Sequence, residues 1–563
     1  MTYAKMTSFD PDDDSVESAD SSGPYDPSIF EEEALEYLKA NDPLCNNAFY
    51  VTFNGDANPN FGFDPLTIDW EKEGSAIAKN EHLKWLEIRD LEQETDEHYL
   101  FCERNQVERV KNAKQFYRAV AANRSIKYLT IEGIITFGLE MRDTVGILGP
   151  FIQNNLNLCY LELSHFTLDT RTAQIIAYYL SHGAKSLEEF RLKRCDGITG
   201  RALEKIMTAL KANPNITTLS LDENQIDDDV AGVLGGALKT LGSLKSLTLN
   251  DYEYDGLHYA SISQVGMAAI AGGLSQNSTL EKLSFRHNHI GVDGGFSLAE
   301  AISNNPALKI KELDLTYAMS PPYAEMILSH HGWAMFFGLL SNCNLESLSL
   351  EGSTISDDDC SALAESINSM ALLRKLNITN CSRVTSSGWA TFYGSLKNNT
   401  SLHECNTRHV SEWLFGNANA NWNMVEDEAI ANTICDRTSI ESICKSNHTL
   451  FLINTTEDSY FNNFHSLSRT KKGLSSTTRS LVKMNTCENK VEVVRQKIIK
   501  YYFIEDNNLH ELAHMELGLL PRVLEHVGKY EPGRLFEVLR AIPSLVHNVD
   551  MSTETNRKRS RTG

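Results

Sequence analysis

A histidine–glutamate–histidine pattern near residue 510 is the first feature of this sequence that could support catalysis. The stretch reads HELAH over residues 510–514, and residues four apart share one face of a helix. His510 and His514 could therefore bind one zinc ion, and Glu511 could activate a water molecule on that zinc. A zinc hydrolase is therefore one interpretation of the chain.

The surrounding residues do not supply the rest of a zinc protease. In the extended motif H-E-x-x-H-x-x-G-x-x-H a glycine and a third histidine follow, but Leu517 and Leu520 occupy those positions here. No phosphate-binding loop, dinucleotide fingerprint, hydrolase elbow or kinase loop occurs elsewhere in the chain. We interpret HELAH as part of a helix that covers one end of the fold. We predict no catalytic residues, no metal and no other cofactor.

Charge and composition limit the kinds of partner that the chain can have. The formal net charge is −23, which disfavours nonspecific attraction to nucleic acid or to anionic membranes. No run approaches the roughly 20 apolar residues that cross a bilayer, and the first residues do not read as a secretion signal. We therefore expect no nucleic acid, no membrane and no small-molecule substrate among its partners.

The cysteines and the tail indicate a compartment. The eleven cysteines contain no C-x-x-C pair, as expected of reduced thiols inside a cell. We therefore expect an intracellular protein that works in the cytoplasm. A nuclear import signal in the basic tail, with Arg557, Lys558, Arg559 and Arg561, is an alternative that would place it in the nucleus.

A repeated motif organises most of the chain. The pattern L-x-x-L-x-L-x-x-N/C is clearest in NITTLSLDENQI (215–226) and TLEKLSFRHNHI (279–290). Each copy predicts a short strand with two inward residues, then a turn, then a helix with apolar residues at 3.6-residue spacing. Stacked units would share one core, because a single unit cannot bury its own apolar face. Related copies begin at Leu83, Ile126, Leu158, Leu187, Leu244, Ile310, Leu345, Leu373 and, in decayed form, Leu402.

Two kinds of polar residue recur at fixed places in the repeats. The ninth motif position carries Asn or Cys, as at Cys195, Asn224, Asn288 and Cys381, and we expect these side chains to bond buried backbone groups where the chain leaves the strand. Aspartate runs at 227–229 and 357–359 fall at the starts of repeat helices. We interpret their carboxylates as helix caps and not as metal ligands.

These repeats resemble the leucine-rich-repeat family, in particular its ribonuclease-inhibitor-like (RNI-like) class with helix-backed repeats. The resemblance covers about residues 80–415. It implies an α/β fold, a right-handed solenoid or horseshoe with a parallel inner sheet and outer helices, and it implies no single function. The following region, with KMNTCENKVEVVRQKIIKYYF and MELGLLPRVLEHVGKY, resembles uncharacterised repeat proteins of photosynthetic protists, which implies no activity.

The flanks of the repeats differ from them in composition. Residues 1–28 are acidic and rich in serine and proline, which predicts a disordered tail. We expect an N-terminal cap over 29–80, the solenoid over 81–415, irregular repeat remnants and a basic loop over 416–486, a helical C-terminal cap over 487–550 and a disordered basic tail over 551–563. The basic residues of 469–500 are expected to form a solvated face of the cap.

The inner strands offer a face on which a partner could bind. Trp85, Tyr128 and Tyr160 occupy the same position of three successive repeats and point to the concave face. Aromatic side chains are favoured interface anchors, although an N-terminal cap could cover these three instead. Two later repeats have longer turns that carry further tyrosines. The predicted partner-binding residues are Trp85, Tyr128, Tyr160, Arg191, Tyr252, Tyr254, Tyr259, Arg286, Tyr317 and Tyr323.

We interpret the chain as a non-enzymatic interaction module that holds one protein partner on its concave face and edge loops. The alternative is a regulator of a small GTPase, because Ran-type GTPase-activating proteins are built from similar repeats. That family carries an acidic stretch after its repeats, whereas here the post-repeat region is basic and the acidic run lies at the opposite end. A zinc hydrolase acting through HELAH is the remote alternative.

Overall fold

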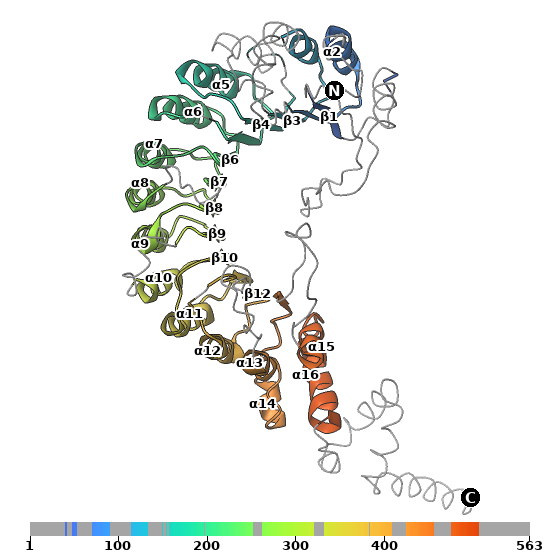
Figure 1. The fold of residues 1–563 in the computed structure, drawn as a ribbon, viewed down its shortest axis with the longest axis vertical. Helices are drawn as coiled ribbons and strands as arrows, with labels where there is room; N and C mark the ends of the chain where they lie inside the picture. The colour runs from blue at the N-terminus through green and yellow to red at the C-terminus, as the bar shows by residue number, and fades with distance from the viewer. Residues whose placement is uncertain are drawn as a thin grey trace, which may run out of the picture. The chain divides into compact units, whose positions relative to one another are not determined.

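The computed structural model describes residues 40–41, 48–52, 70–89, 114–132, 149, 154, 157–195, 197–251, 262–319, 332–381, 383–407, 424–454 and 475–505. The chain divides into two compact units, Met1–Leu345 and Glu346–Gly563. Each unit combines parallel strands with a layer of helices, as Figure 1 shows. None of the described helices has the length and apolar character that a membrane span requires.

The strands of the first unit pair in parallel and in sequence order. Successive strands stay in register, so that Leu86, Leu129 and Leu161 stand beside one another and are fully buried. The strands are β1 (Ala48–Thr52), β2 (Trp85–Arg89), β3 (Tyr128–Glu132), β4 (Tyr160–Ser164), β5 (Glu189–Lys193), β6 (Thr218–Ser220), β7 (Ser246–Thr248), β8 (Lys282–Ser284) and β9 (Glu312–Asp314).

Helices of the first unit lie on one side of these strands (Figure 1). Their apolar residues pack onto the inward leucines, as at Ile206 and Leu210 of α6, which are almost fully buried. The helices are α2 (Trp70–Lys79), α5 (Thr170–His182), α6 (Gly200–Ala212), α7 (Asp228–Leu238), α8 (Gln264–Leu274), α9 (Gly291–Asn304) and α10 (Trp333–Leu340).

The second unit repeats the arrangement with fewer strands. Its strands are β10 (Ser347–Ser349), β11 (Lys375–Asn377), β12 (Glu404–Asn406) and β13 (Leu452–Asn454), paired in parallel. Its helices are α11 (Asp357–Ser369), α12 (Ser386–Ser395), α13 (Met424–Ile434), α14 (Ile440–Cys444), α15 (Ser476–Met484) and α16 (Lys490–Lys497), with a 3-10 helix at Leu396–Asn398 and a π-helix at Ile498–Glu505. The parallel strands and their helix layer confirm the predicted α/β leucine-rich-repeat solenoid.

Strand pairing extends beyond the repeats that the motif identified. β1 pairs with β2, and β13 pairs with β12, although both added strands lie outside the predicted 81–415 solenoid. Their sequences, AFYVT and LIN, do not carry the spaced leucines of the motif, so the periodicity could not reveal them. The predicted domain boundaries themselves stay predictions.

The asparagine side chains at the ninth motif position form hydrogen bonds with buried backbone groups, as predicted. Asn224 donates through Nδ2 to the Leu192 carbonyl at 2.7 Å and accepts from the Cys195 amide at 2.7 Å. Asn288 donates in the same way to the Leu249 carbonyl at 2.6 Å. These side chains therefore satisfy buried backbone groups that the turn leaves without a strand partner.

A second column of buried asparagines, which the sequence analysis did not identify, occupies the turns between helix and strand. Asn305 donates to the carbonyls of Leu274 and Asn277 at 2.8 and 2.6 Å, which links its repeat to the preceding one. The column contains Asn80, Asn123, Asn213, Asn277, Asn305, Asn399, Asn447 and Asn485, all buried. Its signal is an asparagine three residues before the first leucine or isoleucine of a motif copy, as at Asn80, Asn123, Asn213, Asn277 and Asn399.

The aspartate runs cap helices, as predicted, and in each run one member also bonds the start of a helix in the next repeat. Asp227 accepts from the Val230 amide of its own helix at 2.8 Å. Asp228 accepts from the amides of Ser263 and Gly266 at 3.0 and 2.9 Å, at the start of α8 in the next repeat. A carboxylate at a helix start satisfies free N–H groups and opposes the helix dipole.

One expectation for the C-terminal region is wrong. Lys497 of α16 is fully buried, whereas we expected the basic residues of 469–500 to be solvated. Its ammonium nitrogen lies 2.7 Å from the Ile434 carbonyl oxygen and 2.9 Å from Nδ1 of His448. Neutral acceptors surround the nitrogen, so that this buried polar group is hydrogen-bonded, a feature that composition does not reveal.

Candidate protein-binding face

Trp85, Tyr128 and Tyr160 lie next to one another on β2, β3 and β4, because the parallel register pairs these positions. The ring centroids of Trp85 and Tyr128 are 5.4 Å apart with 18° between the planes. Tyr160 lies 6.1 Å from Trp85 and 6.4 Å from Tyr128. All three side chains are half-buried. We call these three residues the aromatic strip.

Arg191 on β5 continues the aromatic strip. Its guanidinium carbon lies 5.3 Å from the centroid of the Tyr160 ring, within cation–π range. Its Nε donates to Oε1 of Glu189 at 2.5 Å. The Tyr160 hydroxyl donates to Glu162, and burial, with Glu162 adding to it, raises the pKa of Tyr160. The phenol therefore keeps its proton at neutral pH and remains a donor.

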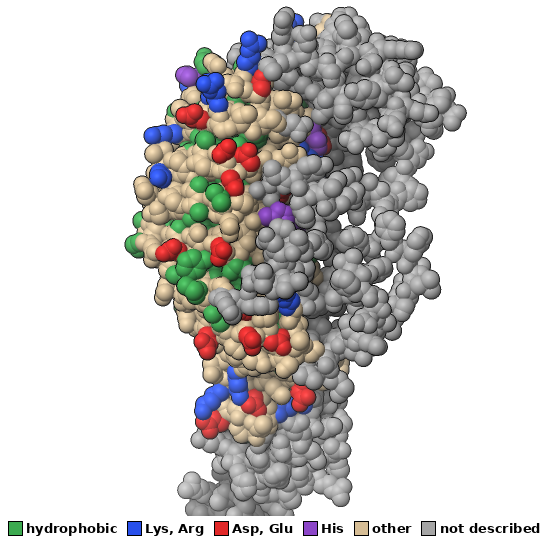
Figure 2. All heavy atoms as spheres, turned by 60° about the vertical axis from the view of Figure 1, so that its left-hand side comes forward, with side chains coloured by type: hydrophobic (Ala, Val, Ile, Leu, Met, Phe, Trp, Pro, Cys, Tyr) green, Lys and Arg blue, Asp and Glu red, His purple; other side chains and the backbone are tan. Residues whose placement is uncertain are grey.

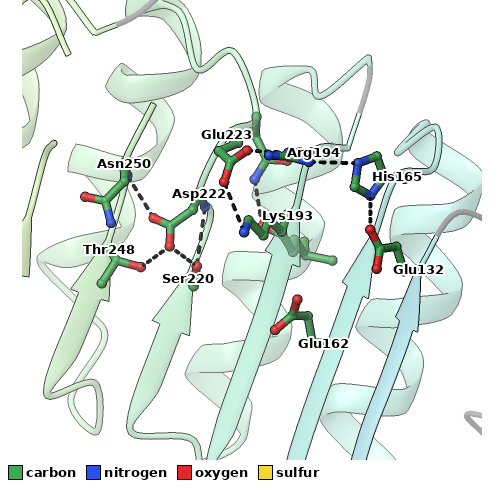
Figure 3. Close-up of polar contacts among 12 residues, drawn as sticks. Glu132, Glu162, His165, Lys193, Arg194, Ser220, Asp222, Glu223, Thr248 and Asn250 are labelled. Atoms are coloured by element: carbon green, nitrogen blue, oxygen red, sulfur yellow. Dashed lines mark hydrogen bonds and ion pairs between the residues drawn. The ribbon is translucent and has the colours of Figure 1, made fainter. Parts of the chain in front are cut away.

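A chain of ionisable side chains follows the carboxyl ends of the neighbouring strands (Figure 3). Nδ1 of His165 lies 3.5 Å from Oε1 of Glu132, and its Nε2 lies 3.3 Å from Nη1 of Arg194. Arg194 also donates to Glu223, which pairs with Nζ of Lys193 at 3.1 Å. We call these five residues the edge cluster. Burial lowers the pKa of His165, so the imidazole is neutral at pH 7.

Backbone conformation places three members of the edge cluster. His165, Arg194 and Glu223 have φ angles of 56°, 50° and 59°, in the left-handed region. Each backbone N–H bonds a carbonyl of the next repeat, as between His165 and Lys193 at 3.1 Å. The sequence analysis missed these residues because it followed only positions that alternate with leucines. They share one motif position, directly before the ninth, and that column is the signal that could have identified them.

The strand face over β6 to β9 is polar, and its side chains bond one another. Asp222 accepts from Ser220 Oγ at 2.7 Å and from Thr248 Oγ1 at 3.0 Å, as Figure 3 shows. Lys282 pairs with Glu312 at 2.9 Å. These side chains are already bonded to one another, so a partner that covered them would remove water from the groups and gain few new hydrogen bonds in return. This part of the face therefore offers less binding energy than the aromatic strip.

Of the other predicted binding residues, the structure describes Arg286 and Tyr317, which lie on later repeats than the aromatic strip. Nε of Arg286 pairs with Asp314 at 2.6 Å. Tyr317 stacks on His287 with centroids 5.1 Å apart and 13° between the ring planes. Tyr252, Tyr254, Tyr259 and Tyr323 lie outside the described residues. A role in partner binding stays a prediction for all of these residues.

The helix-covered surface carries apolar groups of its own. Figure 2 shows hydrophobic side chains toward the middle of this surface, among scattered charged ones. α8 and α10 contain no charged residue, and Val265 and Met335 are 64% and 60% exposed. Single exposed apolar side chains are common on proteins. Because these two do not form a stacked array, the strand face is the stronger candidate.

The HELAH stretch, with His510, Glu511 and His514, lies outside the described residues, and the zinc interpretation stays a hypothesis. Within the described ranges, no group of three or more His, Cys, Asp or Glu side chains could hold a metal ion. The aspartate runs at 227–229 and 357–359 fall inside those ranges and act as caps.

Known proteins are similar to this chain in its repeats. A leucine-rich-repeat family model matches residues 212–229, 276–299 and 341–364. Ribonuclease inhibitor of Mus musculus is 27% identical over 216 residues, which cover 34% of this chain and 45% of that protein. NACHT, LRR and PYD domains-containing protein 9 of Bos taurus is 28% identical over 250 residues, covering 40% of this chain and 24% of that protein.

Similarity to solved structures is weaker. The leiomodin-1 actin-binding site 2 shares 23% identity with a TM-score of 0.24, over 30% of this chain and 86% of that chain. The chain spans less than half the length of the two curated relatives named above.

Proposed function

We propose that this leucine-rich-repeat chain of the RNI-like class is a non-enzymatic module that binds one protein partner. The aromatic strip on the strand face of the first unit is the observation that supports this most directly. Rings that are held in place by stacking lose little conformational freedom on binding, and buried aromatic anchors carry much of the energy of protein interfaces. The two longer turns, 251–263 and 317–333, would add contacts from the edge.

The relatives favour the same class of function but do not supply a partner. The name of the mouse relative describes an inhibitor of ribonuclease, and the match covers 45% of that protein. We therefore propose that this chain, like its relatives, uses its repeats to bind a protein. We do not propose that ribonuclease is the protein it binds. Neither the strand face nor the relatives described above favour the GTPase-activating alternative. A zinc hydrolase stays the remote alternative.

The remaining expectations belong to the same proposal. The module would work inside the cell, in the cytoplasm or, through its basic tail, in the nucleus. Nucleic acid, membranes, small-molecule substrates and cofactors are not expected among its ligands, in line with a net charge of −23. The C-terminal resemblance to repeat proteins of photosynthetic protists adds no activity.

Affinity capture with the full chain tests the proposal. The native protein is compared with the triple variant Trp85→Ala, Tyr128→Ala, Tyr160→Ala, after circular dichroism shows that both fold alike. Tyr178→Ala is the matched control, because Tyr178 is a 55% exposed aromatic residue on α5 of the helix layer. We expect one protein to be retained by the native and control baits and lost by the triple variant. If all three baits retained the same protein equally, the aromatic strip would not be the binding surface for that protein.

A further inference from the structure

The helices α7 to α10 of the first unit contain no lysine, arginine or histidine. They follow one another in the helix layer, and each contacts the next, so their outer sides lie side by side (Figure 1). The preceding helix α6 differs, because it carries Arg201, Lys205 and Lys211. Every charged side chain of α7 to α10 is therefore acidic. We call the outer side of these four helices the helix face.

Apolar groups are exposed on the helix face. Val265 of α8 and Met335 of α10 are 64% and 60% exposed, and Figure 2 shows hydrophobic side chains toward the middle of the helix layer. α10 consists only of apolar residues and glycine, yet Ala334, Met335 and Gly338 are exposed. A surface helix normally turns polar residues outward, and a helix that is apolar on all sides is normally buried. The composition of α10 therefore indicates that another molecule covers its outer side.

Acidic side chains border these apolar groups. α9 lies between α8 and α10, and its Asp293 and Glu300 are exposed. Asp229, in the first turn of α7, is exposed as well. None of these three carboxylates pairs with a described basic side chain, in contrast to Glu312, which pairs with Lys282 on the strand face. A partner's lysine or arginine could therefore pair with them without displacing an existing contact.

We infer that the helix face is a second protein-binding surface and that it binds a basic amphipathic helix of another protein. Such a helix carries an apolar stripe between polar rows. The stripe would cover Val265 and Met335, and the basic rows would pair with Asp293 and Glu300. A second copy of this chain does not match, because its helix face would bring carboxylates against carboxylates. The inference goes beyond the proposed function, which uses the strand face.

A labelled peptide tests this chemistry without knowledge of the natural partner. The probe is a synthetic amphipathic helix with leucines on one face and lysines and arginines on both flanks. One comparison peptide replaces every basic residue with glutamate, and another contains the residues of the probe in scrambled order. Binding to the full chain is measured by fluorescence anisotropy at physiological salt. We expect the probe to bind at least about tenfold more tightly than either comparison peptide.

Substitution of the exposed apolar residues locates the binding. The double variant Val265→Ser, Met335→Ser removes two apolar side chains and keeps the net charge, and it should weaken binding of the probe by about tenfold. The matched control is Leu372→Ser, Val491→Ser, which removes two exposed apolar side chains of the second unit. This control should bind the probe like the native chain. Thermal unfolding of all variants checks that none alters the fold.

Substitution of the acidic residues tests the charge pairing. The double variant Asp293→Asn, Glu300→Gln should weaken binding of the probe by about threefold. The matched control is Asp358→Asn, Glu365→Gln, which removes the same two charges from exposed positions of α11 in the second unit. It should bind like the native chain. Because the net charge changes equally in both variants, nonspecific attraction to an acidic protein affects them alike.

Each other outcome overturns the inference. No binding of the probe, or equal binding of the three peptides, would exclude recognition of a basic apolar stripe. Native-like binding by either helix-face variant, or loss of binding in the triple variant of the aromatic strip, would place the probe elsewhere. If the native chain were a dimer in analytical ultracentrifugation and the serine double variant a monomer, a second copy would be the occupant. The probe does not depend on the aromatic strip, so its failure leaves the proposed function standing.

Discussion

Gly235 of α7 lies so close to Ala269 of α8 that a Cβ atom on Gly235 would stand 2.2 Å from the Ala269 carbonyl oxygen. Gly273 approaches α7 in the same way, because its Cβ would lie 2.2 Å from the Gly235 carbonyl oxygen. No side chain fits at either distance. The spacing of two neighbouring repeats is therefore set by a pair of glycines.

Gly235→Ala should destabilise the first unit by about 1–3 kcal/mol, because the added methyl group forces α7 and α8 apart. Gly236→Ala is the control, since a Cβ there meets nothing within 4 Å. Alanine should instead stabilise the helix at that position by up to about 1 kcal/mol. Urea unfolding followed by circular dichroism measures both. Equal shifts of the urea midpoints of Gly235→Ala and Gly236→Ala would contradict the close approach of α7 and α8.

Asp228→Ala should cost about 1 kcal/mol in the free energy of unfolding, because the amides of Ser263 and Gly266 lose their acceptor at the start of α8. Asp229→Ala removes the same charge from an exposed neighbour in the same helical turn and should cost under about 0.5 kcal/mol. Hydrogen exchange at the start of α8 should rise in the first variant alone. Faster exchange in both would point to the helix dipole in place of the direct bonds.

Asn305→Ala should be among the most damaging polar substitutions in the first unit. It removes bonds to the buried carbonyls of Leu274 and Asn277, and an unsatisfied buried group costs about 1–3 kcal/mol. Asn304→Ala, at the exposed neighbouring position, is the matched control and should change stability little. Differential scanning calorimetry compares the two. An unfolding temperature of Asn305→Ala equal to that of the native chain would show that water replaces the lost hydrogen bonds without loss of stability.

The stability of the second unit should rise with pH above neutrality because of Lys497. Burial lowers its pKa from 10.5 to about 7. Between those values the folded state binds fewer protons than the unfolded state, so the free energy of unfolding should increase by up to about 1.4 kcal/mol per pH unit. It should fall again as the pH is lowered toward 7.

Lys497→Met isolates this contribution, because methionine is of similar length and does not titrate. We expect urea unfolding between pH 7.5 and 9.5 to be flatter in this variant than in the native chain. Lys483→Met, at an exposed position of α15, should keep the native slope. Parallel slopes in the native chain and in Lys497→Met would mean that the acceptors around the nitrogen, the carbonyls of Ile434 and Asn447 and Nδ1 of His448, hold the proton despite burial.

Purified protein should contain no stoichiometric zinc, because HELAH lacks the third ligand that catalytic zinc sites require. Mass spectrometry of the metal content measures this, before and after treatment with a chelator. His510→Ala and His514→Ala should leave both metal content and melting temperature unchanged. One zinc per chain, lost in both variants, would instead favour the zinc hydrolase.

The sequence by itself determined the repeat and its strands. Leucines at fixed spacing predicted β2 to β12, since apolar periodicity reports which residues a strand buries. Even the decayed copy forms β12, with Cys405 and Thr407 buried where leucines were expected. The register of equivalent positions then placed Trp85, Tyr128 and Tyr160 in one column. These features follow from local pattern and from the rule that each repeat stacks on its neighbour.

Only the tertiary structure decided what each polar side chain contacts. Asp228 caps the helix of the next repeat, Arg191 lies on Tyr160, and His165 stands between Glu132 and Arg194. Lys497 is buried although its surroundings in the sequence are basic. These contacts join residues about one repeat apart or more, and their distances depend on how closely adjacent helices and turns approach. Residue type fixes which bonds a side chain can make, and the packing of neighbouring repeats selects among them.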